Sequence, residues 1–421
     1  MSDRTAARDS RATTGSSAAQ ACPSCGGPAG RPFYAVAGVP VHQVKLVRSR
    51  EAALRCARGD IALCLCAACG FVWNAAFDAS RMRYQDDYES TQAVSPTFNA
   101  FHERLARDLI ARFALHGKRV VELGCGQGEF VTMLAELGGN QGFGFDQVIR
   151  DPGTRGRVTF VKDLYAEPYR DLAPDFVCCK MTLEHVHDVA AFLGGLRRTV
   201  GERPDAVVFF MIPEITRILR LRAFWDIYYE HSSSWSPGSL ARAFRRAGFD
   251  PVALWTDYDD QYVLIAARPG SGNGEVLANE EPPQALAAKV DSFSQAVAAD
   301  LARWRERLAR LRRAGKRTVL WGGGSKAVAF LTTLGVTDGI ACAVDVNPRR
   351  AGTFIAGTGQ EIVAPQSLAH DQPDVVIVMS PIYLPEITAQ LARLHVHPAC
   401  LLSVEAPDPL EAYLRSIEGD Q

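Results

Sequence analysis

The sequence predicts a doubly wound α/β fold, in which helices cover both faces of a largely parallel sheet. Three observations lead to this prediction. An apolar strand runs directly into a glycine-rich turn and a helix at 120–137, further apolar strands follow it, and a second strand–glycine–helix unit lies near 318–326. Strands that alternate with helices are typical of parallel sheets. The class predicted is therefore α/β, with two such units in one chain.

Length and composition exclude several classes of protein. A chain of 421 residues with 47% apolar residues predicts two to three domains with substantial cores. The net charge of −1 predicts no nucleic-acid partner, and no apolar run approaches the roughly 18 residues of a membrane span. Residues 1–20 have no apolar core and are predicted to be a disordered tail, not a secretory signal. We therefore expect a cytoplasmic protein; a monomer is compatible with the sequence, which does not determine the oligomeric state.

Two C-x-x-C motifs near the N-terminus predict a metal site. Cys22 and Cys25 form the first, and Cys66 and Cys69 form the second after 40 intervening residues. Four thiolates on two tight turns can close a tetrahedral zinc site with no open position, which is structural rather than catalytic. The gap predicts a small β-subdomain over 39–63, and the remaining alternative is unmetallated cysteines or a redox pair.

A polar and aromatic stretch, 84–90, precedes a helix expected from about Thr97 to His116. It contains Tyr84 and Tyr88 and has no clear period. From the residues alone, these two tyrosines are expected to pack against the core.

The strand and turn at 120–128 carry three glycines, Gly124, Gly126 and Gly128. Glycine is needed where the backbone turns sharply and lies against a ligand. The next strand ends in Asp146, twenty residues after Gly126, where a carboxylate can bind ribose hydroxyls. The pattern Glu-x-Gly-x-Gly-x-Gly differs from the dinucleotide pattern and resembles the first motif of class I S-adenosylmethionine-dependent methyltransferases. The alternative is an ordinary strand–turn–helix.

That resemblance implies roles for neighbouring residues. Glu122 would lie near the sulfonium and the amino group of the methyl donor, and Asp163, after the strand at 158–161, would meet the adenine amino group. The strand at 176–181 ends before Glu184 and His185, where ligands bind in a doubly wound sheet. His185 is therefore either a direct participant in the chemistry or part of a generic sequence common to many such enzymes.

The stretch 224–232, after the all-apolar strand at 206–212, concentrates aromatic and ionisable residues. Tyr228, Glu230 and His231 lie on a connection that should cover the donor site, before a helix beginning near Ser236. A histidine placed there is a candidate acid or base, although a lone histidine is more often structural. Strands near 251–255 and 262–267 are predicted to complete a seven-stranded sheet.

The last third of the chain begins with a linker rich in glycine, acids and proline. A long helix over 286–311 follows, and then the second strand–glycine–helix unit, with Lys326 at the start of its helix. Its next strand ends in Asp345. Lys326 and the helix N-terminus either bind an anion or form a purely structural turn.

The predicted organisation has five segments. They are a disordered tail (1–20), a zinc-binding subdomain (21–80), a methyltransferase domain (81–268), a linker (269–282) and a C-terminal Rossmann-like domain (283–421).

Taken in order, these motifs resemble the sugar C-methyltransferases that act on nucleotide-linked deoxysugars in antibiotic biosynthesis. The resemblance implies two cofactors, S-adenosylmethionine and a structural Zn²⁺, and an acceptor nucleotide between the central and C-terminal domains. It implies that a base removes the proton next to a keto group and that the enolate attacks the donor's methyl. His231 would be the base, Glu230 its orienting partner, and His185 the group that stabilises the enolate oxygen. Tyr228 and Tyr88 would hold the sugar.

The sequence departs from that family at Tyr229, where we expect another histidine, and at Ser234 and Trp235, which replace an aromatic pair. These departures leave the methyltransferase prediction intact but leave the acceptor open. The sequence as a whole has two alternatives. One is O- or N-methylation of a sugar or another small metabolite. The other is a binding module that uses degenerate Rossmann units as a scaffold, which the intact glycine motif and Asp146 disfavour.

Overall fold

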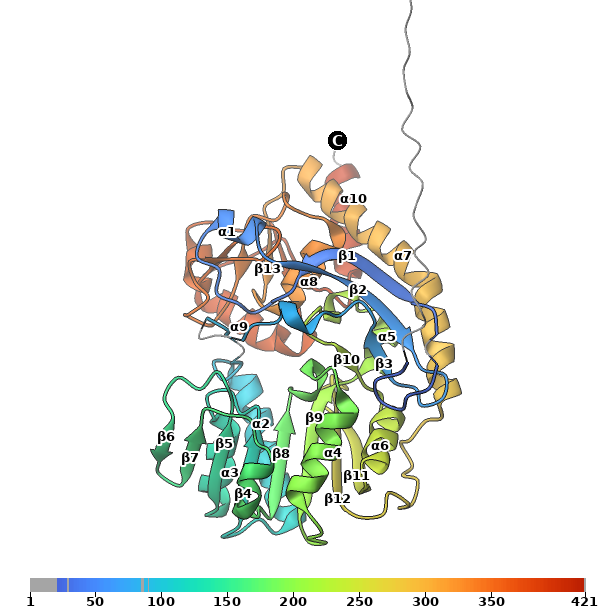
Figure 1. Ribbon diagram of the computed structural model, residues 1–421. Helices are drawn as coiled ribbons and strands as arrows, with labels where there is room; N and C mark the ends of the chain where they lie inside the picture. The colour runs from blue at the N-terminus through green and yellow to red at the C-terminus, as the bar shows by residue number, and fades with distance from the viewer. Residues whose placement is uncertain (1–20, 29, 85–86, 90, 420–421) are drawn as a thin grey trace, which may run out of the picture.

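A computed structural model describes residues 21–28, 30–84, 87–89 and 91–419 of the chain. The predicted disordered tail, residues 1–20, and part of the stretch 84–90 lie outside these described residues. Within them the chain forms three β-sheets of four, eight and six strands. In Figure 1 the eight-stranded sheet occupies the lower half of the molecule and the C-terminal unit the upper half.

The eight-stranded sheet is the doubly wound sheet that the sequence predicts. Its order is β11-β12-β9-β8-β4-β5-β7-β6, and the five strands from β9 to β7 are parallel. The strands are β4 (Arg119–Leu123), β5 (Gln141–Phe145), β6 (Gly153–Arg155), β7 (Val158–Val161), β8 (Phe176–Lys180), β9 (Val207–Pro213), β11 (Phe249–Asp257) and β12 (Tyr262–Pro269). Their parallel arrangement brings the carboxyl ends of β4, β5, β8 and β9 to one edge, where a ligand can bind.

The sheet has one strand more than predicted. β6 pairs antiparallel with β7 at the edge of the sheet, and its three residues are all exposed. An exposed strand that begins at a glycine has no apolar alternation, so the hydrophobic pattern does not reveal it.

Helices cover both faces of this sheet. α2 (Pro96–Phe113) and α3 (Glu129–Gly138) pack on one face, and α4 (Val189–Val200) and α6 (Pro237–Arg246) pack on the other. α5 (Ile215–Leu221) packs instead against α7 (Pro283–Arg313) of the C-terminal unit. The 3₁₀ helices η2 (Glu167–Leu172), η3 (Leu183–His185) and η4 (Phe224–Asp226) lie on the connections. α2 begins one residue before the predicted Thr97 because Ser95 caps it, accepting a hydrogen bond from the N–H of Phe98. It ends at Phe113, because Ala114 adopts a left-handed conformation.

The four-stranded sheet joins the N-terminal residues to the middle of the chain. Its order is β1-β2-β3-β10, with β1 (Tyr34–Pro40), β2 (Arg58–Leu65), β3 (Val72–Asn74) and β10 (Ser233–Ser234). α1 (Arg50–Leu54) and η1 (Ala79–Arg81) lie beside these strands. β10 comes from the connection after β9, so it fixes the stretch 224–232 against the N-terminal strands.

The C-terminal unit has a six-stranded sheet of order β15-β16-β14-β13-β17-β18. Its strands are β13 (Thr318–Trp321), β14 (Ala343–Val344), β15 (Thr353–Phe354), β16 (Glu361–Val363), β17 (Val375–Val378) and β18 (Cys400–Ser403). Its helices are α7 (Pro283–Arg313), α8 (Ser325–Leu334), α9 (Leu384–Arg393) and α10 (Asp408–Gly419), with η5 (Pro365–Ala369) and η6 (Pro381–Tyr383). α7 is longer than the predicted 286–311 and packs against both α5 and α10.

One apolar core runs through residues of the N-terminal strands, the stretch after β9 and the C-terminal unit. Figure 1 shows β1 and β2 extending along the C-terminal unit while β10 lies toward the central sheet. The boundaries of the five predicted segments stay predictions. Among the described residues, no helix has the length and apolar character needed to span a bilayer.

Candidate active site

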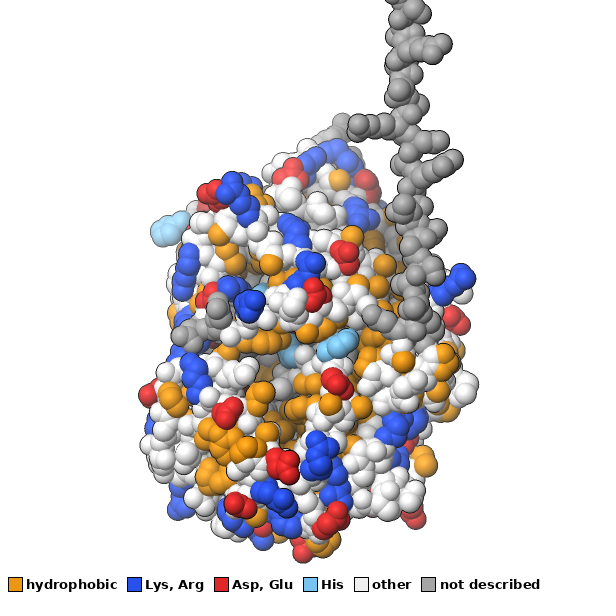
Figure 2. Space-filling model, in the orientation of Figure 1, with side chains coloured by type: hydrophobic (Ala, Val, Ile, Leu, Met, Phe, Trp, Pro, Cys, Tyr) orange, Lys and Arg blue, Asp and Glu red, His pale blue; other side chains and the backbone are white. Residues whose placement is uncertain are grey.

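A cavity of about 1090 Å³ lies between the two larger sheets. Residues that follow strand ends of both sheets line it, which means that the carboxyl edges of the two α/β units face the same space. These residues are Gly124, Asp146, Met181, Glu214, Gly322, Asp345 and Met379. Figure 2 shows a hollow in this face of the molecule, with hydrophobic and histidine side chains gathered around it. The volume exceeds that of an ordinary small-ligand pocket and can hold two ligands at once.

The glycine turn after β4 lines the cavity, and its three glycines have different tasks. All three adopt positive φ, +63° at Gly124, +59° at Gly126 and +90° at Gly128. A Cβ on Gly124 would meet Thr182 at 2.2 Å and one on Gly128 would meet Phe160 at 2.0 Å, whereas one on Gly126 would enter open space. Gly126 is therefore the glycine whose missing side chain leaves room for a ligand, and the other two permit close packing.

Asp146 and Glu122 stand beside this turn. The Asp146 carboxylate accepts hydrogen bonds from the N–H groups of Gly126 (2.8 Å) and Val148 (2.9 Å). Glu122 is buried, and its carboxylate lies 3.2 Å from the Lys180 ammonium. Both carboxylates line the cavity, with oxygen lone pairs that these contacts leave free for a ligand's hydroxyl or amino groups.

Asp163 lies at the rim of this region. Its carboxylate is exposed and accepts hydrogen bonds from the Tyr169 hydroxyl (2.7 Å) and the Leu164 N–H (2.7 Å). Residues 164–168, immediately after it, line the cavity, but Asp163 itself does not. It stands next to the predicted adenine region, and its side chain has other partners.

Two histidine rings meet in the middle of the cavity wall. The rings of His185, on η3, and His231, on the connection after β9, pack edge to face with centroids 5.1 Å apart. Burial lowers the pKa of both imidazoles, and desolvation, with a smaller contribution from the neighbouring His185 ring, holds the pKa of His231 well below its usual value. Both rings are therefore neutral near pH 7, which is the state in which an imidazole can accept a proton.

Glu230 contacts different partners from the one that the sequence predicted. Its carboxylate accepts hydrogen bonds from the Tyr88 hydroxyl (2.6 Å) and the Gln43 N–H (2.5 Å), and lies 3.6 Å from His42 and 3.9 Å from His185. Among the described residues no hydrogen bond joins Glu230 to His231. Both residues line the cavity, but the Glu230 carboxylate is held by the N-terminal residues and His231 packs on other rings, so neighbours in sequence are not partners in space.

Burial opposes ionisation of Glu230, but His42, His185, Tyr88 and Gln43 together lower its pKa below the usual value. It is therefore an anion at neutral pH. Tyr84 completes this side of the site through a hydrogen bond of 3.0 Å between its hydroxyl and His185 Nδ1.

The tyrosines of the stretch 224–232 divide between the cavity and the core. Tyr228 lines the cavity, packs against the His231 ring with centroids 4.7 Å apart, and donates a hydrogen bond to Asp226 (2.8 Å). Tyr229 points the other way and is fully buried, and its hydroxyl accepts a hydrogen bond from the Asp78 N–H. The residue that departs from the sugar-enzyme pattern is thus a core residue.

Glu184 is a buried acid next to the two histidines. Burial raises its pKa to about 8, and its Oε2 has no hydrogen-bond partner within the described residues. It is therefore protonated at neutral pH and has a hydroxyl to donate. Donor atoms of Glu184, His185 and His231 lie within 4.8 Å of one another, so the three groups act on one small volume of the cavity.

The four cysteines of the two C-x-x-C motifs come together as predicted. Their sulfur atoms all lie within 4.8 Å of one another, with Cys22 and Cys69 3.8 Å apart and Cys25 and Cys66 3.5 Å apart. Four sulfurs at ~2.3 Å from a zinc ion would be about 3.8 Å apart, so the cluster fits a tetrahedral zinc. No other side chain is needed to complete the coordination.

Each cysteine pair sits on the same kind of tight turn. The N–H of Gly26 donates to the carbonyl of Cys22 (2.8 Å), and that of Gly70 to the carbonyl of Cys66 (2.8 Å). Gly26 has a φ of +74° and Gly70 a φ of +70°, and residues with a side chain rarely adopt such values. Arg242 of α6 donates to the carbonyl of Cys69, which joins this cluster to the central unit and places it away from the cavity. Cys56 and Cys64 lie outside the cluster.

Sequence reasoning missed His42 and Gln43, which lie on the connection after β1 and hold the Glu230 carboxylate from the N-terminal side. No local pattern marks them, because their partner lies nearly 190 residues away. It also treated Glu184 as generic. The only local sign was an acid directly after an apolar strand, at the ligand-binding edge of the sheet.

Two regions of the chain match known protein families. Residues 98–254 match the family described as a methyltransferase domain, and residues 273–400 match the C-methyltransferase C-terminal domain. C-methyltransferase NovU of Streptomyces niveus is 26% identical over 306 residues, which cover 68% of this chain and 72% of the relative. The chain therefore combines a methyltransferase domain with a C-methyltransferase C-terminal domain, and it is an S-adenosylmethionine-dependent methyltransferase.

Other relatives of this methyltransferase match a shorter region. A ubiquinone biosynthesis O-methyltransferase of Neisseria meningitidis serogroup C is 31% identical over 157 residues, 32% of this chain and 65% of that relative. Among solved structures, a Burkholderia thailandensis 1,6-didemethyltoxoflavin-N1-methyltransferase with bound S-adenosylhomocysteine is 17% identical. It covers 40% of this chain and 78% of its own, with a TM-score of 0.32.

The methyltransferase presents the features that its donor requires at the end of β4 and β5. Gly126 leaves open space, and Asp146 and Glu122 offer carboxylate oxygens beside it. The predicted fold class, the donor and the enzyme class are thus confirmed. The predicted resemblance to C-methyltransferases is confirmed as well.

Proposed function

We propose that this methyltransferase C-methylates a nucleotide-linked keto-deoxysugar. The observation that carries the proposal is the shared cavity, in which a neutral His231 and a neutral His185 face the space between two carboxyl strand edges. S-Adenosylmethionine supplies the methyl group when bound. Roles in deoxysugar and antibiotic biosynthesis stay predictions.

The chain's own residues generate the carbon nucleophile. His231 takes the proton from the carbon next to the keto group, and the electron pair of that C–H bond moves onto the carbonyl oxygen as an enolate. His185 and the protonated Glu184 lie beside His231 and stabilise the oxygen's charge by hydrogen bonding. The enolate carbon then forms the new C–C bond as the donor's S–C bond breaks.

The remaining predicted site residues hold the ligands. Glu122, Gly124, Gly126, Gly128, Asp146 and Asp163 form the donor site, with Gly126 and Asp146 in direct contact and Asp163 at its rim. Tyr88 and Tyr228 face the sugar. Glu230 orients Tyr88 and His185 rather than His231, which replaces the role predicted from the sequence.

The acceptor's nucleotide fits the C-terminal side of the cavity. Asp345 at the end of β14 accepts hydrogen bonds from the N–H groups of Gly323 (2.9 Å) and Asn347 (2.8 Å). This arrangement places a carboxylate beside a glycine turn, where a ribose can bind. Asp345 and His231 both line the cavity, so one acceptor can contact both.

The decisive experiment combines turnover with proton exchange. Purified enzyme with labelled donor and a panel of nucleotide-linked keto and non-keto sugars should methylate the keto sugars. His231→Asn should lower turnover by roughly 10²–10⁴-fold and stop exchange of the α-proton with deuterated water. His370→Asn, which changes an exposed histidine away from the cavity, is the matched control.

O- or N-methylation of a small metabolite is the second candidate, and the likeness of part of the chain to an O-methyltransferase favours it. A hydroxyl or amine acceptor has no carbon-bound proton to exchange. Methylation without any exchange would therefore contradict the C-methylation proposal, and wild-type turnover of His231→Asn would make His185 the next candidate base. A scaffold without activity would fail to bind S-adenosylhomocysteine in an isothermal titration.

We further propose that the four cysteines bind one zinc ion that stabilises the N-terminal unit and takes no part in the chemistry. Cys66→Ser should lower the stability of this unit more than it lowers donor affinity, because metal-binding free energy contributes to folding. Elemental analysis of protein purified without chelators should find about one zinc per chain. A value well below one would contradict this proposal.

A further inference from the structure

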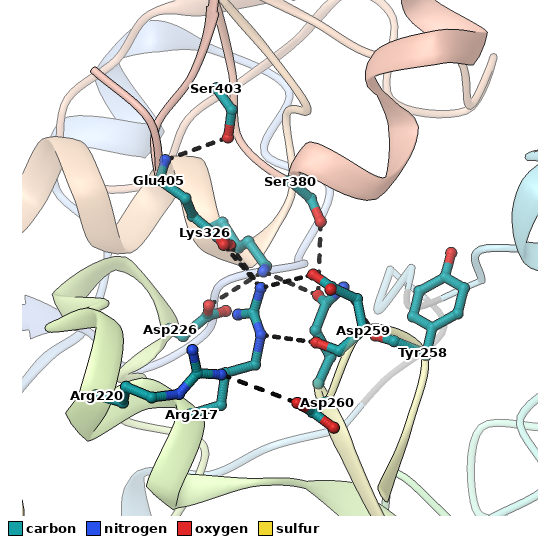
Figure 3. Close-up of polar contacts among 11 residues, drawn as sticks. Arg217, Arg220, Asp226, Tyr258, Asp259, Asp260, Lys326, Ser380, Ser403 and Glu405 are labelled. Atoms are coloured by element: carbon teal, nitrogen blue, oxygen red, sulfur yellow. Dashed lines mark hydrogen bonds and ion pairs between the residues drawn. The ribbon is translucent and has the colours of Figure 1, made fainter. Parts of the chain in front are cut away.

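Lys326 connects the C-terminal unit to the wall of the active-site cavity. It lies at the start of α8, and its ammonium is 3.0 Å from an Asp226 carboxylate oxygen and 3.2 Å from the amide oxygen of Gln261 (Figure 3). Both partners belong to the central unit. The side chains of Lys326 and Asp226 are only 20% and 13% exposed, so solvent weakens this ion pair less than a surface pair.

Asp226 links Lys326, through Tyr228, to the proposed base His231. Its second carboxylate oxygen accepts the Tyr228 hydroxyl at 2.8 Å. The Tyr228 ring in turn packs edge to face on His231, with centroids 4.7 Å apart. One carboxylate therefore joins a lysine of the C-terminal unit to the aromatic ring that fixes the His231 imidazole.

The turn immediately before Gln261 has a strained backbone. Tyr258, Asp259 and Asp260 all adopt positive φ, +57°, +58° and +54°. The left-handed conformation is unfavourable for residues other than glycine, and such strain persists only where the surroundings hold it. A run of three such residues just before Gln261 needs a specific support.

Arg217 supplies that support and also spans the two units. It is 3% exposed, and its guanidinium donates to the carbonyl of Asp259 at 2.9 Å and to the carboxylate of Glu405 at 2.7 Å (Figure 3). Glu405 lies after β18 in the C-terminal unit. Two charged contacts, Arg217 with Glu405 and Lys326 with Asp226, thus hold the same corner of the cavity from both sides.

We propose that Lys326 is a positioning residue for the methyl-transfer site, which acts through Asp226 to hold Tyr228 against His231. The C-terminal unit then completes the acid–base site of the methyltransferase unit. This inference rests on the proposed role of His231. Without Lys326, the largely buried Asp226 carboxylate loses its direct ion pair and keeps only the longer-range interaction with Arg217, and its hydrogen bond with Tyr228 changes.

The kinetic test compares three lysine variants. Lys326→Met should lower kcat about 10- to 100-fold, because a small displacement of reacting groups costs rate, with KM and S-adenosylhomocysteine affinity changed less than about twofold. Lys326→Arg keeps the charge and should recover most of kcat. Lys316→Met is the matched control: Lys316 pairs with Asp374 in the same unit and does not line the cavity.

A double-mutant cycle separates positioning from direct ligand binding. If Lys326 acts through Asp226, adding Lys326→Met to Asp226→Asn should cause little further loss of kcat. If Lys326 instead binds an acceptor phosphate, Lys326→Met should raise KM, and the two losses should multiply. That second result overturns the proposal.

A structural test needs no acceptor and so stays decisive if the proposed acceptor is wrong. In the S-adenosylhomocysteine complex of Lys326→Met, the Tyr228 hydroxyl should leave Asp226 and its ring should shift from His231. Lys326→Arg should keep both contacts. An unchanged Tyr228 in Lys326→Met overturns the positioning role, whereas failure of the proposed function shows separately, as wild-type turnover of His231→Asn.

Discussion

The chain contains the same strand–glycine–helix arrangement twice, and the two copies face each other across one cavity. In the central unit Asp146 accepts the N–H groups of Gly126 and Val148, at 2.8 and 2.9 Å. In the C-terminal unit Asp345 accepts those of Gly323 and Asn347, at 2.9 and 2.8 Å. The same backbone device closes both turns.

The two copies differ in the side chains around that device. Glu122 precedes the first turn by two residues and forms a buried ion pair, whereas Leu320 stands at the matching place in β13 and joins an apolar core. The first turn has three glycines with positive φ, and the second has one, Gly322. The comparison teaches that an acid bound to a glycine turn is a structural feature of the fold, while the additional glycines and acid indicate the methyl donor.

Among variants that test the difference between the two turns, the largest loss of donor binding is expected for substitution of Gly126. Gly126→Val should abolish measurable donor binding, because the side chain would enter the cavity at a φ that valine disfavours. Gly324→Val is the matched variant: Gly324 has φ −92° and open space around its Cβ position. It should retain donor binding in an isothermal titration with S-adenosylhomocysteine. Normal affinity in Gly126→Val would place the donor elsewhere.

A smaller effect is expected from the paired aspartates. Asp146→Ala should weaken donor binding by about 1–3 kcal/mol through lost charge-assisted hydrogen bonds. Asp345→Ala should leave donor affinity within about twofold and instead raise KM for the nucleotide-linked acceptor. Titration and steady-state kinetics on both variants separate the two sites. Equal loss of donor affinity in the two variants would mean that the cavity is not divided in this way.

A pH-dependent effect is expected from the acid after β8. Glu184 has a folded-state pKa of about 8, above its unfolded value near 4.5, so the folded state retains a proton that the unfolded state loses. Its contribution to stability is complete below pH 4.5 and is lost as pH rises to about 8, with a slope approaching about 1.4 kcal/mol per pH unit. Ile382 occupies the matching place on η6 and does not titrate.

Glu184→Gln should therefore flatten the decline in the free energy of unfolding between pH 5 and 8. Chemical denaturation of wild type and variant at several pH values measures this difference. Parallel pH profiles for the two proteins would show that Glu184 ionises normally in the folded state.

The local sequence determined the elements that carry strong local patterns. The apolar strand before Gly124, the twenty-residue spacing to Asp146 and the paired cysteines predicted a methyl-donor site and a metal cluster, and the structure places the cysteines together. Such patterns are readable because strand, turn and helix preferences act over a few residues. β6 escaped notice because an exposed three-residue edge strand has no hydrophobic period.

Only the tertiary structure decided which ionisable groups meet. Glu230 and His231 are adjacent in sequence, yet the Glu230 carboxylate contacts Tyr88, Gln43 and His42, and His231 packs on His185 and Tyr228. Likewise, the sequence left open whether Lys326 binds an anion, and in the structure it pairs with Asp226, a hundred residues earlier in the chain. The physical reason is that the partners and the pKa of a buried ionisable group depend on its desolvation and on the residues that sheet packing brings beside it. The neighbouring residues in the sequence determine neither the desolvation nor these partners.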